Sequence, residues 1–257
     1  TTGANNTAVG YQAGTHMVPG GATPSFNTYI GYQSGFYMDD GASNVGVGYR
    51  ALYSNSSEAN DGADNVAVGK NALLTLTDGT KNTAVGTGAG DAITTDKNVV
   101  AIGYSAYSTQ DTSNDAEGSS GHGSGNIAIG YQSMQSFNHV DFLRNTAVGL
   151  QTMSAGTSDV AQDNVALGYR ALQLITTGDS NTSVGSKALN SITTGSDNCS
   201  LGKNSLSALT NGGNNIAIGS NAVNSLNGTG SSNSAGNRNI GIGGYALANL
   251  KGTHADA

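Results

Sequence analysis

The feature that most constrains this chain is a five-residue motif of the type Asn-Thr-Ala-Val-Gly, which occurs thirteen times along 257 residues. Successive copies are spaced by 17 residues or by 17 plus an insertion, and no spacing is shorter than 17. A solenoid coil cannot shorten without losing register, whereas extra residues can leave it as a loop, so the spacing predicts stacked coils with a 17-residue basic repeat. The final residues of the motifs are Gly10, Gly31, Gly48, Gly69, Gly86, Gly103, Gly130, Gly149, Gly168, Gly185, Gly202, Gly219 and Gly243.

Each motif contains a short run of residues with the period of a β-strand. The residue before the glycine is Val, Ile or Leu in all thirteen copies, and the residue two places before it is small in twelve, Tyr29 being the exception. We expect one strand per coil, with the Val, Ile or Leu pointing inward. Cys199 replaces a Thr or Val in this strand and is expected to be a small, buried hydrophobic residue.

Asparagine and glycine mark two expected corners of the coil. Asn stands four places before the glycine in twelve of thirteen copies, and Val99 replaces it once. Identical Asn side chains on successive coils can form a hydrogen-bonded ladder, and the glycine suits a corner that needs positive φ or close backbone approach. The structural repeat positions include Asn6, Gly10, Asn27, Gly31, Asn44, Gly48, Asn126, Gly130, Asn164, Gly168, Asn181, Gly185, Asn215 and Gly219.

The composition excludes several classes of protein. With 39 glycines, no Trp and 11% charged residues, the chain cannot fill a globular core of ordinary thickness. A net charge of -7 without a basic stripe argues against nucleic acid as a partner. No stretch approaches the ~20 apolar residues of a membrane helix, so membrane insertion is not expected. We therefore predict an all-β fold, a parallel β-solenoid or β-roll of about 13 coils.

The insertions divide one repeat domain, residues 1–257, into two regions. Residues 1–145 are predicted to form loop-decorated coils, and residues 146–257 more regular, shaft-like coils. The Leu or Met column at the fourth place after the glycine, and the six Tyr residues directly after it, are expected outside the thin tube. Exposed apolar columns of that length mark a partner surface, and we expect a homotrimer around the rod axis.

Three stretches carry a family resemblance: Asn6 to Gly14, with the sequence Asn-Thr-Ala-Val-Gly-Tyr-Gln-Ala-Gly, Asn126 to Ser133, and Asn164 to Leu172. They resemble the head repeat of trimeric autotransporter adhesins, a left-handed parallel β-roll. They also resemble the repeat region of phage tail fibres that end in a self-cleaving intramolecular chaperone of the endosialidase type. The resemblance covers essentially the whole chain, although the adhesin repeat is shorter than 17 residues and no chaperone domain follows Ala257.

This resemblance implies a left-handed, trimeric rod in a virion or extracellular fibre that attaches to a host or cell surface. Maturation cleavage would account for the missing chaperone domain. The resemblance transfers no catalytic residue, and a purely structural filament or coat subunit is the alternative. The expected partners are copies of the chain itself and a cell-surface glycan or protein.

The inserted loops are the expected recognition elements, because binding residues sit on loops that a rigid scaffold holds. Two segments are rich in the aromatic and acidic side chains that glycan or protein recognition uses. Packing between the chains of an oligomer is the alternative for both segments. The candidate contact residues are Phe36, Tyr37 and Asp39 in the first segment and Phe137, His139, Asp141, Phe142 and Arg144 in the second.

A cation site in the longest insertion is a weaker hypothesis. Asp111, Asp115, Glu117 and His122 lie there among Ser and Gly residues. Their spacing matches neither an EF-hand nor the glycine-rich roll motif that binds calcium, and a flexible polar loop explains them equally. We predict no metal and no cofactor.

Enzymatic activity is not expected. The four His residues are scattered over different loops, so no Ser-His-Asp or Cys-His constellation can be argued from their spacing. A polysaccharide depolymerase stays as a lesser alternative, because tail spikes that depolymerise polysaccharide are built on β-solenoids. Such an enzyme needs two carboxylates across a cleft, whereas pairs such as Asp61 and Asp64 lie in polar turns typical of solvated surface charge. Paired Thr residues such as Thr176–Thr177 also suggest ice binding, but a stacking corner explains them more simply.

Overall fold

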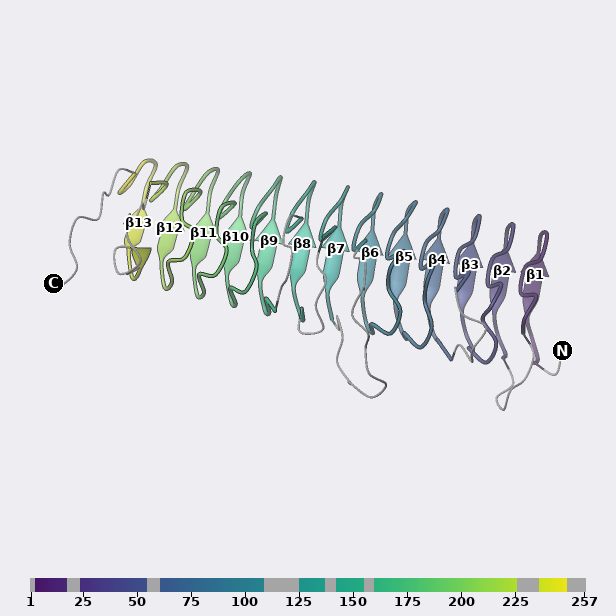
Figure 1. Ribbon diagram of the computed structural model, residues 1–257. Coiled ribbons are helices and arrows are strands. Elements are labelled where there is room, and N and C mark those ends of the chain that lie inside the picture. Colours follow the sequence, from purple (N-terminus) through teal and green to yellow (C-terminus); the bar gives the residue numbers. More distant parts are fainter. Residues whose placement is uncertain are drawn as a thin grey trace.

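The chain folds into a rod of stacked coils in the computed structural model, which describes residues 3–17, 24–54, 61–108, 125–136, 142–154, 160–225 and 236–248 (Figure 1). Each coil contributes one three-residue strand to a single sheet. The strands are β1 (Thr7–Val9), β2 (Thr28–Ile30), β3 (Val45–Val47), β4 (Val66–Val68), β5 (Thr83–Val85), β6 (Val100–Ile102), β7 (Ile127–Ile129), β8 (Thr146–Val148), β9 (Val165–Leu167), β10 (Thr182–Val184), β11 (Cys199–Leu201), β12 (Ile216–Ile218) and β13 (Ile240–Ile242).

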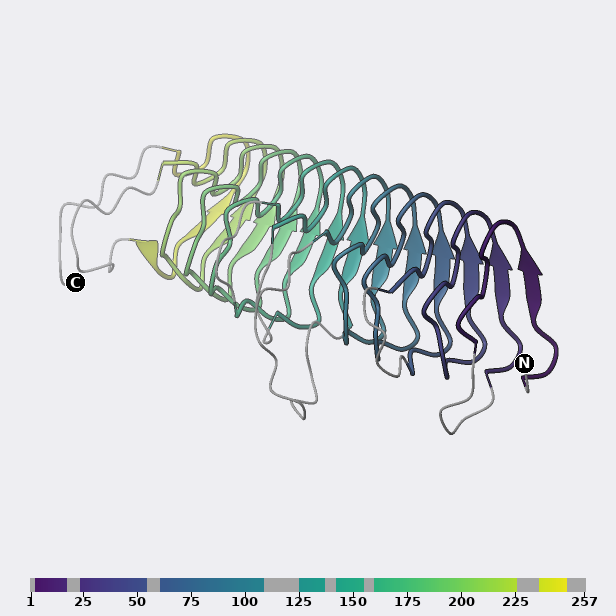
Figure 2. The ribbon, with the colours of Figure 1, turned by 45° about the vertical axis from the view of Figure 1, so that its right-hand side comes forward.

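The thirteen strands form one parallel sheet in strict sequence order (Figure 2). Equivalent residues of successive repeats pair with one another, as Thr7 with Thr28 and Val9 with Ile30. The pairing keeps the same register across insertions, for instance between Ile102 and Ile129. The predicted all-β parallel solenoid is therefore confirmed, and the described residues contain no α-helix.

The inward and outward faces of the strands are the reverse of the sequence prediction. The small middle residue points into the coil and is fully buried, as Ala67 and Ala166 are, while the flanking residues Val68 and Leu167 are exposed. The prediction that the Val, Ile or Leu before the glycine points inward is therefore wrong. Cys199 lies on this outer face and is half-buried, so its predicted role as a buried hydrophobic residue is also wrong. The coil is so thin that only a small side chain fits at the inner strand position.

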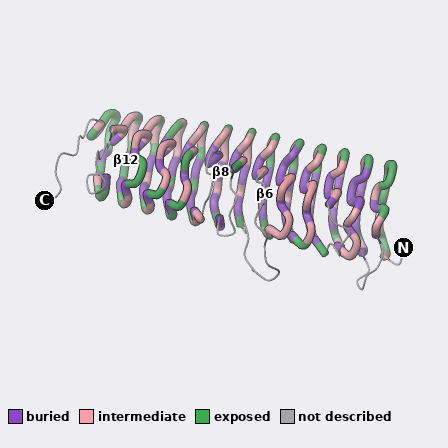
Figure 3. The backbone as a smooth tube through the Cα atoms, in the orientation of Figure 1, coloured by how far each residue is buried: buried purple, intermediate pink, exposed green. Residues whose placement is uncertain are grey.

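The coil interior is filled from its opposite side by the residue at the fourth place after the glycine. Leu52, Met134 and Leu189 are fully buried there, so the prediction that this column lies outside is wrong. Figure 3 shows buried residues in successive coils along the rod. A second buried column stands at the seventh place after the glycine and includes Leu76 and Ile192. The alanine column of the strands packs against these larger side chains.

At one inner strand position a large residue, Tyr29, replaces the usual small one, because the residues that face it are glycines. Tyr29 is fully buried, and the fourth-place residues of the two nearest coils are Gly14 and Gly35. A Cβ atom on Gly35 would lie 2.5 Å from the Tyr29 ring, and one on Gly46 would lie 3.1 Å from it. The aromatic ring therefore occupies volume that Leu side chains fill elsewhere.

The predicted Asn corner is a hydrogen-bonded ladder that is interrupted at Val99. In a typical rung, the backbone N–H of Asn198 donates to Oδ1 of Asn181 at 3.1 Å, and Nδ2 of Asn198 donates to the same oxygen at 2.9 Å. Nδ2 of Asn198 also donates to the Gly212 carbonyl of the next coil at 2.8 Å. Each amide thus satisfies buried backbone groups on two neighbouring coils.

The glycine corner is also confirmed. All thirteen motif glycines have φ between 119° and 138°. For the twelve glycines from Gly10 to Gly219, a Cβ atom would come within 2.3 to 2.7 Å of the next coil's motif glycine. Both positive φ and close backbone approach therefore require glycine at this position.

Candidate functional site: an exposed apolar sheet face

The outer face of the sheet is a mainly apolar surface that runs along the described rod. Its residues are the first and third of each strand, and every one of them is Val, Ile, Leu, Thr or, at Cys199, cysteine. No charged side chain interrupts the face in any of the thirteen strands. The most exposed of its apolar residues, between 36% and 69% accessible, are Val9, Ile30, Val68, Val85, Ile102, Val165, Leu167, Leu201, Ile216, Ile218, Ile240 and Ile242.

The dimensions of this face follow from strand geometry. Strands at ~4.8 Å spacing give a length of roughly 60 Å, and three residues give a width of roughly 10 Å. The resulting area of about 600 Å² reaches the upper end of what the largest apolar patch on a soluble monomer covers. A face of this size and uniformity has the character of a contact surface.

A column of tyrosines extends the face along the carboxyl ends of the strands. Tyr11, Tyr32 and Tyr49 stack on one another with ring centroids 5.4 and 5.3 Å apart, and Tyr104 and Tyr131 stack at 5.3 Å. All five rings are exposed, so the prediction that the Tyr column lies outside the tube is confirmed. The stacking prearranges the rings in a row and reduces the conformational entropy that a partner would have to remove.

The insertions leave the coil at a different edge of the rod from the tyrosines. Every interruption between described segments falls between the interior residue at the fourth place and the Asn corner, as between Met17 and Pro24 or between Ser108 and Gly125. The glycine and tyrosine turn never carries an insertion in the described residues. The repeat therefore separates a smooth sheet face from a variable edge.

An aromatic cluster lies on this variable edge in the first three coils. The His16 ring stacks on Tyr37 with centroids 4.8 Å apart, and Phe36 stacks on Tyr53 at 5.4 Å. Phe36 and Tyr37 meet edge to face at 4.5 Å, and the Arg50 guanidinium lies 4.8 Å from the Tyr53 ring centroid. The candidates Phe36 and Tyr37 are thus brought together, and most of their ring contacts are to one another and to their neighbours.

Asp39, the third candidate in this segment, lies half-buried beside the cluster. Burial raises the pKa of the Asp39 carboxyl, the electrostatic interaction with His16 lowers it, and the neighbouring Asp40 raises it. Its Oδ1 atom is buried without a hydrogen bond. The carboxyl is therefore less readily ionised than an ordinary surface aspartate.

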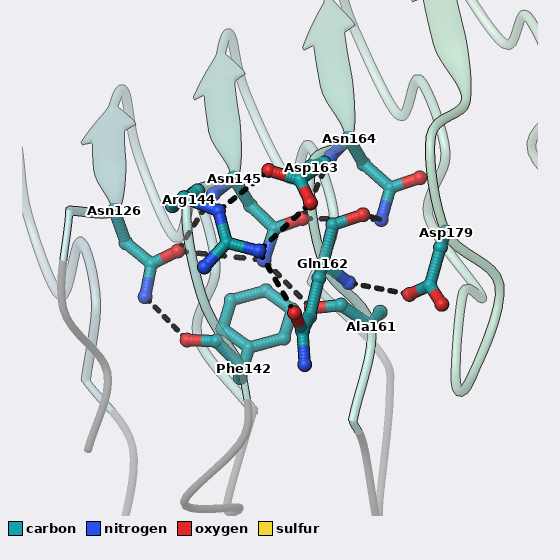
Figure 4. A network of polar contacts seen from close by, with 9 residues as sticks. All are labelled: Asn126, Phe142, Arg144, Asn145, Ala161, Gln162, Asp163, Asn164 and Asp179. Carbon is teal, nitrogen blue, oxygen red and sulfur yellow. Dashed lines mark hydrogen bonds and ion pairs between the residues drawn. The ribbon is translucent and has the colours of Figure 1, made fainter. Parts of the chain in front are cut away.

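The two described candidates of the second segment, Phe142 and Arg144, differ in burial and belong to one network of polar contacts (Figure 4). Phe142 is buried in the core, and its carbonyl accepts a hydrogen bond from Nδ2 of Asn126 at 2.7 Å. Arg144 is exposed and binds Asp163 through two hydrogen bonds of 2.7 and 2.8 Å. Phe142 is thus a packing residue, and Arg144 joins two coils.

The Arg144 contact continues along the rod. Arg144 donates to Oε1 of Gln162 at 2.9 Å, and the Gln162 backbone N–H donates to Asp179 at 2.7 Å. The arginine holds the pKa of the Asp163 carboxyl below its usual range, and the carboxylate raises the pKa of Arg144. These contacts cross three successive coils, and their exposure to water makes their contribution to stability small.

Several predicted residues lie outside the described part of the chain: Phe137, His139 and Asp141, and the cation candidates Asp111, Asp115, Glu117 and His122. Within the described residues, no group of three or more His, Cys, Asp or Glu is placed to hold a metal ion. The same segments contain no helix long and apolar enough to span a bilayer.

The paired threonines act on the backbone of the next coil. The hydroxyl of Thr176 donates to the Thr193 carbonyl at 3.0 Å, and the hydroxyl of Thr193 donates to the Thr210 carbonyl at 3.1 Å. These bonds support the interpretation of the Thr pairs as a stacking corner.

The exposed apolar surface is the sheet face, which the strand periodicity did not predict. The signal was present in the volumes, since the middle strand residue is almost always Ala, Ser or Gly and a thin coil has no room for more. Fold and surface together define a parallel β-solenoid repeat protein with an apolar outer sheet face. Comparisons with family models, with curated proteins and with solved structures gave no match for this chain.

Proposed function

We propose that this chain is the rod segment of a virion or extracellular fibre, in which three copies associate through their sheet faces. In this proposal the rod provides reach, and the loop-bearing edge attaches the fibre to a host or cell surface. The coils wind left-handed, as the resemblance of the repeat implies. The protein acts by binding and carries no catalytic function.

The uninterrupted apolar sheet face carries this proposal. Leaving a mainly aliphatic face of about 600 Å² in water on each copy is unfavourable, and burying its apolar part yields roughly 25 cal/mol per Å² before the entropic cost of association. A flat face that repeats without charge along the whole rod suits a partner with the same repeat, and a second and third copy offer one.

The position of the loops agrees with this arrangement. The insertions leave the coil on an edge that the sheet face does not include, so copies joined through the face keep that edge accessible. The aromatic cluster around Tyr37 lies on the same edge. Attachment and assembly would thus use separate surfaces of each coil.

A charged substitution in the face tests the association. We expect Leu167→Lys, in β9, to convert the native trimer into monomers in sedimentation velocity, because an unpaired ammonium group would be buried between copies. Leu174→Lys is the matched control, since Leu174 is 39% exposed and Leu167 is 37% exposed, but Leu174 lies outside the face. Circular dichroism should show the same β-structure in both variants.

Two results would contradict the proposal. The first is a native chain that sediments as a compact monomer at all concentrations. The second is a trimer that Leu167→Lys leaves intact, which would place the contact on another surface of the rod.

A further inference from the structure

Charge is segregated along one edge of the rod, the turn edge, which consists of the two residues that follow each motif glycine. None of the 17 Asp and Glu residues of the chain stands at these positions, although the net charge is -7. Five of the ten basic residues do, namely Arg50, Lys70, Arg170, Lys187 and Lys203. The turn edge is therefore neutral or positive in all thirteen coils of an acidic chain.

The backbone holds the turn edge in a regular row. The N–H of the second residue after each glycine donates to the carbonyl of the first residue in the preceding coil, as Arg50 does to Tyr32 at 2.9 Å and Lys187 to Tyr169 at 2.8 Å. Equivalent side chains of successive coils thus follow one another at steps of ~4.8 Å.

Two arginines of this row are positioned in the same way. Nε of Arg50 donates to Oε1 of Gln33 at 2.9 Å, and Nε of Arg170 donates to Oε1 of Gln151 at 3.0 Å. Each of these glutamines donates in turn to a glutamine of the coil before it. The arrangement therefore occurs twice, after β3 and after β9, six coils apart in the sheet.

Each guanidinium also lies against the tyrosine that precedes it. The Cζ atom of Arg50 is 5.4 Å from the Tyr49 ring centroid, and that of Arg170 is 5.1 Å from the Tyr169 centroid. The Nη atoms of both arginines form no hydrogen bond or ion pair with a described residue. The glutamine and the ring thus orient each guanidinium and leave its two NH₂ groups for a ligand.

These groups define the chemistry of a ligand. The two NH₂ groups of an oriented guanidinium match a carboxylate, and exposed tyrosine rings offer an apolar face with a polar tip to a sugar ring. Five cations over roughly 60 Å are too few for duplex DNA, which carries one charge per ~1.7 Å. A regular row with sparse positive charge suits a linear polysaccharide in which carboxylated sugars recur.

We propose that the turn edge binds a linear polysaccharide of carboxylated sugars, which lies along the rod with Arg50 and Arg170 as its two anchors. Lys70 and Lys187 are exposed one coil beyond the anchors and add electrostatic attraction. The Asp91 side chain approaches the edge between the anchors, so the attraction is strongest at the anchors themselves. This inference goes beyond the proposed function and does not rest on it, because the turn edge lies outside the strand positions of the sheet face and outside the loop-bearing edge.

Glutamine substitutions of the two anchors test the proposal. Glutamine already occupies this place in the preceding coils, so Arg50→Gln/Arg170→Gln extends each glutamine row by one residue and is expected to fold. Arg144→Gln/Lys81→Gln is the matched control, since it removes the same charge from exposed positions outside the turn edge. Circular dichroism should show the same β-structure in all three chains.

Isothermal titration calorimetry with oligosaccharides of alginate, a linear polymer of uronic acids, measures the binding. The native chain and the control should bind with equal affinity, and the anchor variant at least about 10-fold more weakly, because charge-assisted hydrogen bonds are lost at both anchors. Oligosaccharides whose carboxyl groups are reduced to alcohols should bind the native chain no better than alginate binds the anchor variant. No binding by the native chain, or equal binding by the anchor variant, would overturn the proposal.

Oligosaccharide length shows whether one polymer spans both anchors. Six steps of ~4.8 Å separate the anchors by roughly 29 Å. Oligosaccharides longer than this distance should bind the native chain at least about 10-fold more tightly than shorter ones, and Arg50→Gln alone should remove the difference. Affinity independent of length would refute a ligand that lies along the rod.

Tyrosine substitutions distinguish a polysaccharide from an acidic polypeptide. Leu150 occupies the tyrosine place in one coil, so the turn accepts leucine in Tyr49→Leu/Tyr169→Leu. This variant should bind alginate roughly 2- to 10-fold more weakly than the native chain. Polyglutamate that binds the native chain as tightly as alginate does would assign the edge to acidic proteins and overturn the proposal.

Sedimentation velocity separates this inference from the proposed function. The anchor variant should keep the assembly state of the native chain, and a changed state would mean that the turn edge joins copies of the chain instead of binding a polysaccharide. Sedimentation reports the sheet-face contact and calorimetry reports the turn edge, so either proposal can fail alone.

Discussion

At the scale of single residues, the interior tolerates large departures from the repeat only where neighbours compensate. Tyr29 replaces a small residue in a column that is otherwise narrow, and Gly14, Gly35 and Gly46 surround it. The sequence shows each of these exceptions, but their coupling depends on which positions face one another across the coil. Periodicity within a strand does not contain that information.

A substitution at Gly35 tests this coupling. Gly35→Ala should reduce the free energy of unfolding by about 2 to 4 kcal/mol, because its Cβ would lie 2.5 Å from the Tyr29 ring and φ is 61°. Gly88→Ala is the control, since φ is 65° and the nearest atom is 3.3 Å away on the Asp91 side chain. It should cost only about 1 kcal/mol.

Urea denaturation of both variants, and of Gly35→Ala in a Tyr29→Ala background, measures these differences. The cost of Gly35→Ala should fall to that of Gly88→Ala once the ring is absent. Equal costs for Gly35→Ala with and without Tyr29 would show that the ring does not fill the space above the glycine.

At the scale of one coil, the Asn corner shows how the fold accommodates a missing ladder residue. Val99 has no side-chain amide, yet its backbone N–H still donates to Oδ1 of Asn82 at 2.9 Å. On the next coil, Nδ2 of Asn126 donates to the hydroxyl of Tyr107 at 3.0 Å. Tyr107 occupies the buried column that Leu or Met fills in most coils, so one aromatic residue provides both packing and the missing acceptor.

Removal of that hydroxyl should weaken the corner. Tyr107→Phe is expected to lower the free energy of unfolding by about 1 kcal/mol, because Asn126 loses one of its hydrogen bonds in a buried site. Tyr131→Phe should change it by less than about 0.5 kcal/mol, since Tyr131 is exposed. Thermal or urea unfolding compares the two, and a Tyr107→Phe variant as stable as Tyr131→Phe would refute the role of the hydroxyl.

The elements that the sequence predicted and those that it did not differ in one physical respect. Spacing and residue identity determine the coil, the Asn ladder and the glycine corner, because each depends on equivalent residues of successive coils. Which strand residues point inward depends on the space between the two sides of the coil. Ala67 and Leu73 together fill that space, and the residues of one repeat position alone do not show how it is divided. Positive φ at non-glycine residues such as Leu73 and Lys187 was equally hidden, since interactions between coils stabilise it.

At the scale of the whole molecule, the outward orientation of the Val, Ile and Leu side chains of the strands changes where the proposed contact surface lies. The sequence predicted a partner surface of Leu, Met and Tyr, and the structure buries the Leu and Met while exposing the Val and Ile columns instead. The candidate loop residues are only partly tested by position, because Phe137, His139 and Asp141 lie outside the described segments. Aromatic and acidic composition identifies a loop as a candidate, but it does not determine whether a side chain such as Phe142 is buried.

Cys199 gives a direct test of how copies align in the proposed trimer. It is the only cysteine, it lies on the sheet face in β11, and it is half-buried in the single chain. Parallel, in-register association around one axis would place the Cys199 residues of all copies at the same height. Antiparallel association would place each beside a coil near the other end of the rod, well beyond the ~7 Å that a disulfide can bridge.

Treatment with a short thiol-to-thiol cross-linker should therefore yield covalent dimers of the native chain. A Cys199→Ser/Thr182→Cys variant, with the thiol one coil away in the same column, should give a comparable yield. A Cys199→Ser/Lys187→Cys variant, with an exposed thiol outside the sheet face, should give little. Equal yields from all three would mean that collisions rather than a defined interface join the chains. A yield confined to Lys187→Cys would place the contact on the other side of the coil.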